Sequence, residues 1–234
     1  MNTINQLVEV VIVTYSVDQQ RCFDLIHSIR QQGFISKNIQ INVIVNDTSD
    51  VYNNFTHSIQ DIENVKTFLG SEFEVAPSRG WRSQQWIKLA IAKNIKTPWY
   101  VVIDSDQKMY PDHIIELEDW YQDSRACYKP VALQTIEQGD YSWFAEYYKN
   151  AARFWNIRLD KYANNLLSET PPVMMHTESV VNMLLHCDKS LIFKNLVHDF
   201  GLYWTYLIKE NLIEKLYRPI LNINKKHQLI HERV

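Results

Sequence analysis

Three short runs of apolar, largely β-branched residues constrain the fold of this 234-residue chain more than any other feature. They cover residues 7–14, 39–45 and 99–103, and the first run reads LVEVVIVT. Runs of this length without polar alternation are typical of strands that are buried on both faces, as in parallel sheets. A further, weaker strand is expected within residues 65–75.

Segments with helical spacing of apolar residues separate these runs. We expect helices over residues 17–32, ending before Gly33, and over residues 80–95. Pro111 is typical of the first position of a further helix. The alternation predicts an α/β fold with a mostly parallel, Rossmann-like sheet and helices on both sides.

The alternation loosens after about residue 124. We expect a strand over residues 128–136, an aromatic-rich helix over 141–155 and a break at Pro171-Pro172, followed by helices over 178–186 and 200–212. The chain contains no obvious linker, repeat or low-complexity segment. We therefore expect residues 1–234 to form one domain.

Composition narrows the class of protein. Hydrophobic residues make up 46% and charged residues 22%, which is ordinary globular usage. The net charge of −3 gives no reason to expect a nucleic-acid partner. The three cysteines are far apart and predict neither a zinc site nor a disulfide framework. Because no leader pattern or apolar run of about 18 residues is present, we expect a cytoplasmic protein.

Polar clusters follow three of the expected strands. They are Thr14-Tyr15, residues 46–50 and residues 104–106. Ligands of open α/β sheets bind beyond the carboxyl ends of the strands, so these clusters predict a binding site at one edge of the sheet.

The motif VVIDSDQ at residues 101–107 is the sharpest of these signals. Asp104 and Asp106 leave a buried strand two residues apart, so both carboxylates can reach one Mg²⁺ or Mn²⁺, cations that prefer oxygen ligands. The alternative is an ordinary turn, for which Asp-Ser-Asp is also suitable.

The helix before this strand has a polar and aromatic face. Trp81, Gln85 and Lys88 are spaced i, i+4 and i+7 and therefore share that face. An indole, an amide and an ammonium would suit a sugar ring, its hydroxyls and a phosphate. Arg79 and Arg82 at the helix start could add anion contacts. The alternative is that Trp81 is core and the charges are solvated.

These two segments carry a resemblance to a known group of enzymes. The strand, the D-x-D motif and the chain length resemble nucleotide-sugar glycosyltransferases of the GT-A fold. Residues 80–89, GWRSQQWIKL, together with residues 100–106, YVVIDSD, are similar to a bacterial family of capsule and lipopolysaccharide glycosyltransferases. Residues 199–203, DFGLY, resemble a later element of that family. The position that matches Asp199 is usually Glu in the family.

The resemblance implies a GT-A-like fold and a glycosyltransferase of the hexosyl type that uses a nucleotide-sugar donor, for which we expect a UDP-linked sugar. Mn²⁺ or Mg²⁺ would bind at Asp104 and Asp106, and Lys88 with a nearby arginine would contact the diphosphate. The acceptor would be a surface polysaccharide or lipopolysaccharide. Residues 1–124 would form a nucleotide-binding half and residues 125–234 an acceptor-side half.

The resemblance also implies roles for other residues. Thr14, Tyr15 and Asp47 would hold the nucleoside. Asp199 would be the general base that deprotonates the acceptor hydroxyl, although it could instead be a helix N-cap. His176 would face the acceptor or complete the metal shell.

Two other classes of function remain open at this stage. A phosphohydrolase of the haloacid dehalogenase type also places D-x-D after a strand, but usually on the first strand of the fold. A non-catalytic nucleotide- or glycan-binding subunit would carry the same binding residues. The basic segment at residues 225–227 suggests at most a peripheral contact with the inner membrane.

Overall fold

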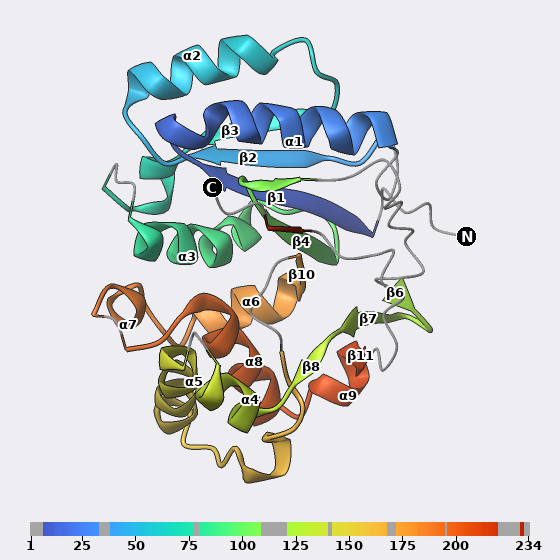
Figure 1. The fold of residues 1–234 in the computed structure, drawn as a ribbon, viewed down its shortest axis with the longest axis vertical. Coiled ribbons are helices and arrows are strands. Elements are labelled where there is room, and N and C mark those ends of the chain that lie inside the picture. The colour runs from blue at the N-terminus through green and yellow to red at the C-terminus, as the bar shows by residue number, and fades with distance from the viewer. Residues whose placement is uncertain are drawn as a thin grey trace.

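The computed structural model describes residues 7–32, 38–76, 80–108, 121–139, 142–167, 172–194, 196–219 and 230–231. A five-stranded sheet with the order β10-β4-β1-β2-β3 lies at its centre (Figure 1). Parallel pairing joins β1 (Val8–Thr14), β2 (Ile41–Val45), β3 (Val65–Leu69) and β4 (Trp99–Asp104), and β10 (Val173–His176) is antiparallel to β4. The predicted mostly parallel α/β sheet is confirmed.

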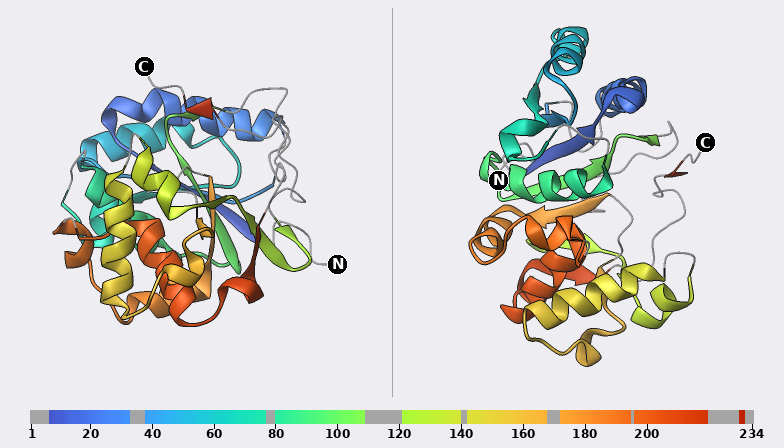
Figure 2. Two further views of the ribbon diagram at one scale, coloured as in Figure 1. Left: turned by 60° about the horizontal axis from the view of Figure 1, so that its bottom comes forward. Right: turned by 90° about the vertical axis from the view of Figure 1, so that its left-hand side faces the viewer.

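Helices cover both faces of the sheet, which explains why its central strands are largely apolar, with the buried Glu9 and Asn42 paired to each other. Every residue of β1 and β2 is buried. Figures 1 and 2 show α1 (Gln19–Gln32) and α2 (Ser49–Ile59) on one side and α3 (Trp81–Ala90) on the other. Right-handed crossovers produce this arrangement, because the chain first moves outward from β1 to β3 and then returns past β1 to β4.

The sequence analysis did not identify α2, although local signals for it exist. The Thr48 hydroxyl accepts a hydrogen bond from the Val51 amide at 3.5 Å and caps the helix. Phe55 and Ile59, four residues apart, are its buried positions. A capping residue followed by apolar residues at this spacing is a recognisable helix start.

Short 3₁₀ segments complete this part of the chain. They are η2 (Ser16–Asp18) before α1, η3 (Gly70–Phe73) after β3, and η4 (Ile91–Lys93) after α3. A Cβ atom on Gly70 would lie 2.5 Å from Oδ1 of Asn46, so only glycine lets η3 pass this close to the end of β2.

Smaller strand pairs flank the central sheet. A three-stranded sheet contains β6 (Tyr121–Gln122), β7 (Arg125–Tyr128) and β11 (Tyr217–Pro219). Two-residue pairs join β5 (Gln107–Lys108) to β12 (Ile230–His231), and β8 (Pro130–Val131) to β9 (Leu166–Leu167).

The prediction of one strand over residues 128–136 is wrong in its second part. The extended chain ends at Val131, and α4 (Leu133–Gln138) follows. Leu133 and Ile136 both pack against the core. They are three residues apart, a spacing that places them on one face of a helix and on opposite faces of a strand.

The remaining helices form a second layer beneath the sheet in Figure 1. They are α5 (Trp143–Phe154), α6 (Thr177–Leu184), α7 (Ser190–Phe193), α8 (Asp199–Lys209) and α9 (Ile213–Leu216), with a 3₁₀ segment, η6 (Asp160–Tyr162). All residues of α8 from 199 to 208 are buried. A helix that is apolar on all sides is a core helix.

Aromatic side chains fill much of the core around α8. The Trp155 indole N–H donates to the Leu202 carbonyl, and the Trp204 indole N–H donates to the Asn165 carbonyl, each at 3.2 Å. The helix expected at Pro111 lies outside the described residues. Within the described part of the chain, no helix is long and apolar enough to cross a membrane. The division into halves at residue 124 stays a prediction.

Candidate functional site

The carboxyl ends of β1, β2 and β4 meet at one edge of the sheet, because the three strands are parallel neighbours. The Asn46 amide donates to the Thr14 carbonyl at 2.8 Å. Oδ2 of Asp47 accepts from the Ser16 amide at 3.0 Å, and its Oδ1 accepts from the Thr48 amide at 2.8 Å. The loops that follow β1 and β2 are thus tied together.

The D-x-D motif lies at the same edge. Asp104 is the last residue of β4, and its amide donates to the Gln107 side-chain oxygen at 3.2 Å, which closes the turn. Burial first, then a hydrogen bond with Asp18, and then the charges of Asp18 and Asp106 raise the pKa of the Tyr15 hydroxyl. Thr14 is fully buried.

Lys88 reaches this edge from α3 and contacts the first acid of the motif. Its Nζ lies 2.6 Å from Oδ1 of Asp104, and the residue is only 7% exposed. The Tyr100 hydroxyl donates to the Lys88 carbonyl at 2.9 Å and holds this turn of α3 against β4. The spacing of α3 predicted a functional face, but the contact with Asp104 could not be read from it.

The charge around Lys88 is predominantly negative. Burial alone would lower the pKa of the Lys88 ammonium, but the charges of Asp104, Asp199 and Asp106 outweigh it and raise that pKa above its usual value. Lys88 therefore stays protonated near neutral pH. Lys88 thus pairs directly with Asp104 in a net negative environment, so an anionic ligand that binds here would need a further cation beside it.

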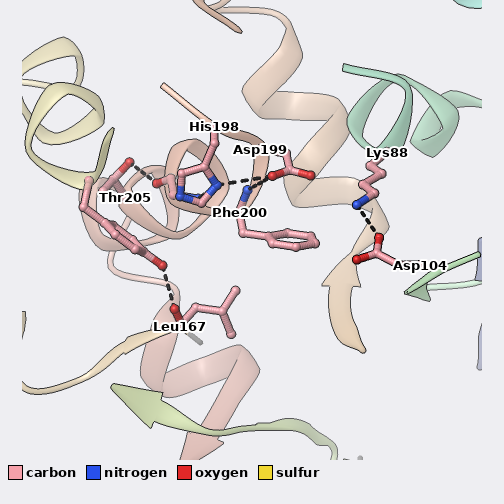
Figure 3. Close-up of polar contacts among 9 residues, drawn as sticks. Lys88, Asp104, Leu167, His198, Asp199, Phe200 and Thr205 are labelled. Atoms are coloured by element: carbon pink, nitrogen blue, oxygen red, sulfur yellow. Dashed lines mark hydrogen bonds and ion pairs between the residues drawn. The ribbon is translucent and has the colours of Figure 1, made fainter. Parts of the chain in front are cut away.

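The third acid enters from α8. His198, and not Asp199, is the N-cap of α8, because a His198 ring nitrogen accepts from the Gly201 amide at 3.4 Å. The alternative role of Asp199 as the cap is thereby corrected. Asp199 lies between His198 and Lys88 (Figure 3).

One carboxylate oxygen of Asp199 is hydrogen-bonded, and the other is buried without a hydrogen-bond partner among the described residues. Its Oδ1 accepts from the Phe200 amide at 2.9 Å and lies 3.2 Å from Nδ1 of His198. Among the described residues, its buried Oδ2 has no hydrogen-bond partner. Buried polar atoms are nearly always partnered, so an open carboxylate oxygen beside Lys88 is suited to receive a hydrogen bond or a proton from a ligand.

Gln85 is a second buried group with unmet polar atoms. It is 2% exposed, and neither its Oε1 nor its Nε2 has a hydrogen-bond partner within the described part of the chain. It lies one helical turn before Lys88 on the same face of α3. Its amide is therefore available for hydroxyl groups of a ligand.

Other predicted residues are not brought to Lys88. Arg82 donates to the Phe193 carbonyl at 3.0 Å, so it joins α3 to α7. Trp81 packs among aromatic rings of α5. Arg79 lies outside the described residues.

His176 is at the opposite end of β4 from Asp104. It pairs with Trp99 in the sheet, and its ring packs against the Trp99 ring with centroids 4.9 Å apart. Its Nδ1 lies 2.9 Å from the Ser179 hydroxyl, and burial lowers its pKa. Its strand partner Trp99 is five residue steps, about 16 Å, from Asp104 of the D-x-D motif. The expectation that His176 completes the metal shell is corrected.

Asp104 and Asp106 fit a hard divalent cation only in part. Their carboxylates offer oxygen ligands, but the described residues contain no group of three or more His, Cys, Asp or Glu side chains that could hold a metal. Mg²⁺ is commonly bound by one or two carboxylates together with water and substrate phosphates. The two acids therefore suit a cation that arrives with a phosphorylated substrate.

The parallel sheet, its flanking helices and the acidic edge define a GT-A-like α/β protein. Solved structures that share this fold include the following two. The WbbM bifunctional glycosyltransferase aligns with a TM-score of 0.53, 14% identity, and coverage of 89% of this chain and 38% of that one. Staphylococcus aureus TarS 1–349 in complex with UDP aligns with a TM-score of 0.50, 14% identity, and coverage of 92% and 60%. This chain spans less than two thirds of either.

The chain belongs to DUF6492, a family of unknown function, whose profile matches residues 1–233. A search of curated protein sequences found no significant match. At 14% identity, the structural matches establish the fold and leave the activity to be argued from the site.

Proposed function

We propose that the protein is a glycosyltransferase that moves a sugar from a UDP-linked donor to an acceptor hydroxyl. The observation that carries this proposal is the placement of Lys88 between the strand-end acid Asp104 and the buried acid Asp199. An ammonium that can contact a phosphate and a carboxylate that can accept a proton thus lie side by side. They do so at the edge of the sheet where ligands of such folds bind.

The donor would lie along this edge. Thr14, Tyr15 and Asp47 would surround the nucleoside, and the Lys88 ammonium would contact the diphosphate. The TarS structure with a similar fold is a complex with UDP, which supports this nucleotide as the first to test. Gln85 would hydrogen-bond to donor hydroxyls with its unpartnered amide.

The proposed cofactor is Mn²⁺ or Mg²⁺, held by Asp104 and Asp106. When bound, the cation would supply positive charge that stabilises the departing diphosphate. Its arrival would require Lys88 to share or release Asp104, which lies at 2.6 Å. Lys88 would then be available to the substrate.

Asp199 would be the general base if the transfer inverts the anomeric centre. The acceptor hydroxyl would give its proton to the open Oδ2, and its oxygen would form the new bond to the anomeric carbon. The bond from that carbon to the diphosphate oxygen would break, and UDP would leave with the electron pair. The acceptor is proposed to be a bacterial surface polysaccharide or lipopolysaccharide, synthesised in the cytoplasm or at the inner membrane surface.

A thermal-shift panel tests this proposal. UDP, GDP, CDP and ADP are each added with and without Mn²⁺ to the wild type and to Asp104→Asn and Asp106→Asn. UDP at about 100 times its Kd stabilises by about 2.7 kcal/mol, which is about 5–10 °C for a chain of this size. We expect that shift only for the wild type with UDP and Mn²⁺ together.

Asp160→Asn is the matched control, because this acid is 74% exposed and paired only locally with Arg158. It should retain the full shift. An equal shift without Mn²⁺ would remove the cation from the proposal. Phosphate release from a phosphomonoester, without any UDP-dependent shift, would favour the phosphohydrolase class instead.

A further inference from the structure

Four aromatic rings that the sequence analysis did not connect form one cluster on the surface. This aromatic cluster consists of Trp81 at the start of α3 and Trp143, Phe144 and Tyr147 on α5. Trp81 and Trp143 pack edge to face with centroids 5.4 Å apart, and Trp143 and Phe144 stack at 3.9 Å. Tyr147 is 6.1 Å from Trp81 and lies beneath both indoles with 8% exposure.

The two indoles are held in place but not covered. Trp81 is 41% exposed and Trp143 is 43% exposed. Isolated exposed apolar residues are common, whereas two adjacent, mutually packed indoles form one continuous apolar patch on which a ligand can bind. Because neighbouring rings restrict their rotation, little conformational entropy would be lost when a ligand binds.

The aromatic cluster adjoins the proposed base. Phe144 and Tyr147 contact the His198 ring with centroids 5.2 and 5.7 Å apart. His198 caps α8 and is followed directly by Asp199. The inner rings of the cluster therefore pack on the buried residue that precedes Asp199.

We propose that the aromatic cluster is an acceptor subsite that stacks the apolar face of a neutral pyranose ring. This inference rests on the proposed glycosyl transfer. The C–H groups on one face of a pyranose carry slight positive charge and match the negative face of an indole. The rings carry no charge, so they favour a sugar face over a phosphate.

Trp143→Ala is the test variant and Phe154→Ala is its control. Phe154 is on the same helix and 40% exposed, but it lies eleven residues further on, about 16 Å along the axis. Wild type and both variants are applied to an array of neutral bacterial surface oligosaccharides, and calorimetry gives the affinity for the strongest binder. UDP affinity with Mn²⁺ and the melting temperature are measured on the same preparations.

We expect Trp143→Ala to weaken oligosaccharide binding by at least about tenfold, as for a central aromatic anchor. UDP affinity should be unchanged, and Phe154→Ala should match the wild type. Trp143→Tyr, which keeps an aromatic face, should restore most of the oligosaccharide binding and guards against a folding defect.

Three results would overturn the subsite. They are a wild type that binds no oligosaccharide on the array, equal losses for Trp143→Ala and Phe154→Ala, and a fall in UDP affinity in Trp143→Ala. A different result would contradict the proposed function: a wild type that does not bind UDP.

Discussion

Replacing Lys88 by Met tests the centre of the proposed site most directly. Methionine keeps the length and much of the volume of the buried chain but removes the ammonium that lies 2.6 Å from Asp104. The change leaves two acids, Asp104 and Asp199, without this neighbouring cation. Asp199 is 3% exposed, so water cannot replace the lost charge there.

Two separate losses follow from this geometry. A charge-assisted hydrogen bond to phosphate contributes about 1.5–3 kcal/mol, so affinity for UDP should fall by about 10- to 150-fold. Folding stability should fall by about 1–3 kcal/mol, the cost of leaving a buried polar group without its partner. The lower part of that range is favoured, since the Asp104 side chain is 28% exposed and can be hydrated.

Calorimetric titration with UDP, carried out well below the melting temperature, separates the two losses. Lys93→Met is the matched control, because Lys93 lies five residues further on and is exposed. It should change neither quantity. The reasoning would be refuted if Lys88→Met bound UDP and turned over substrate as the wild type does.

Two further predictions concern buried acids with different roles. Asp199→Asn should keep UDP binding and lose turnover by about 10²–10⁴-fold, the usual contribution of a positioned base. The variant keeps the N-cap of α8, because the cap is His198. Turnover at the wild-type rate would remove Asp199 from the mechanism. Glu9→Leu should lower the free energy of unfolding in urea by about 3 kcal/mol. The reason is that the Glu9 carboxylate accepts from the Asn42 side-chain amide and from the Lys96 backbone amide, each at 2.7 Å. An unchanged unfolding midpoint would show that these contacts contribute nothing.

Local patterns were sufficient for the parallel strands of the sheet but not for β10 or for every element beside the sheet. The runs at residues 7–14, 39–45 and 99–103 predicted β1, β2 and β4, because strands buried on both faces are largely apolar. The strand predicted over residues 128–136 was wrong at its end. There, the three-residue spacing of Leu133 and Ile136 carried the helical signal within a short apolar segment.

The edge of the sheet was predictable for the same reason. Parallel strands place their carboxyl ends together, so polar residues after three such strands had to meet. The sequence alone thus determined that Asp47 and Asp104 belong to one edge. It also determined that Trp81, Gln85 and Lys88 share a helix face, since helical periodicity is a local property.

Only the tertiary structure decided which of these groups touch. Lys88 meets Asp104 through the packing of α3 on β4. Asp199 comes close to Lys88 from a distant part of the chain because α8 is buried beneath the sheet. The antiparallel register of β10 carried His176 to the other end of β4. Such contacts depend on how whole elements dock, and docking is set by the complete core rather than by the pattern within any one segment.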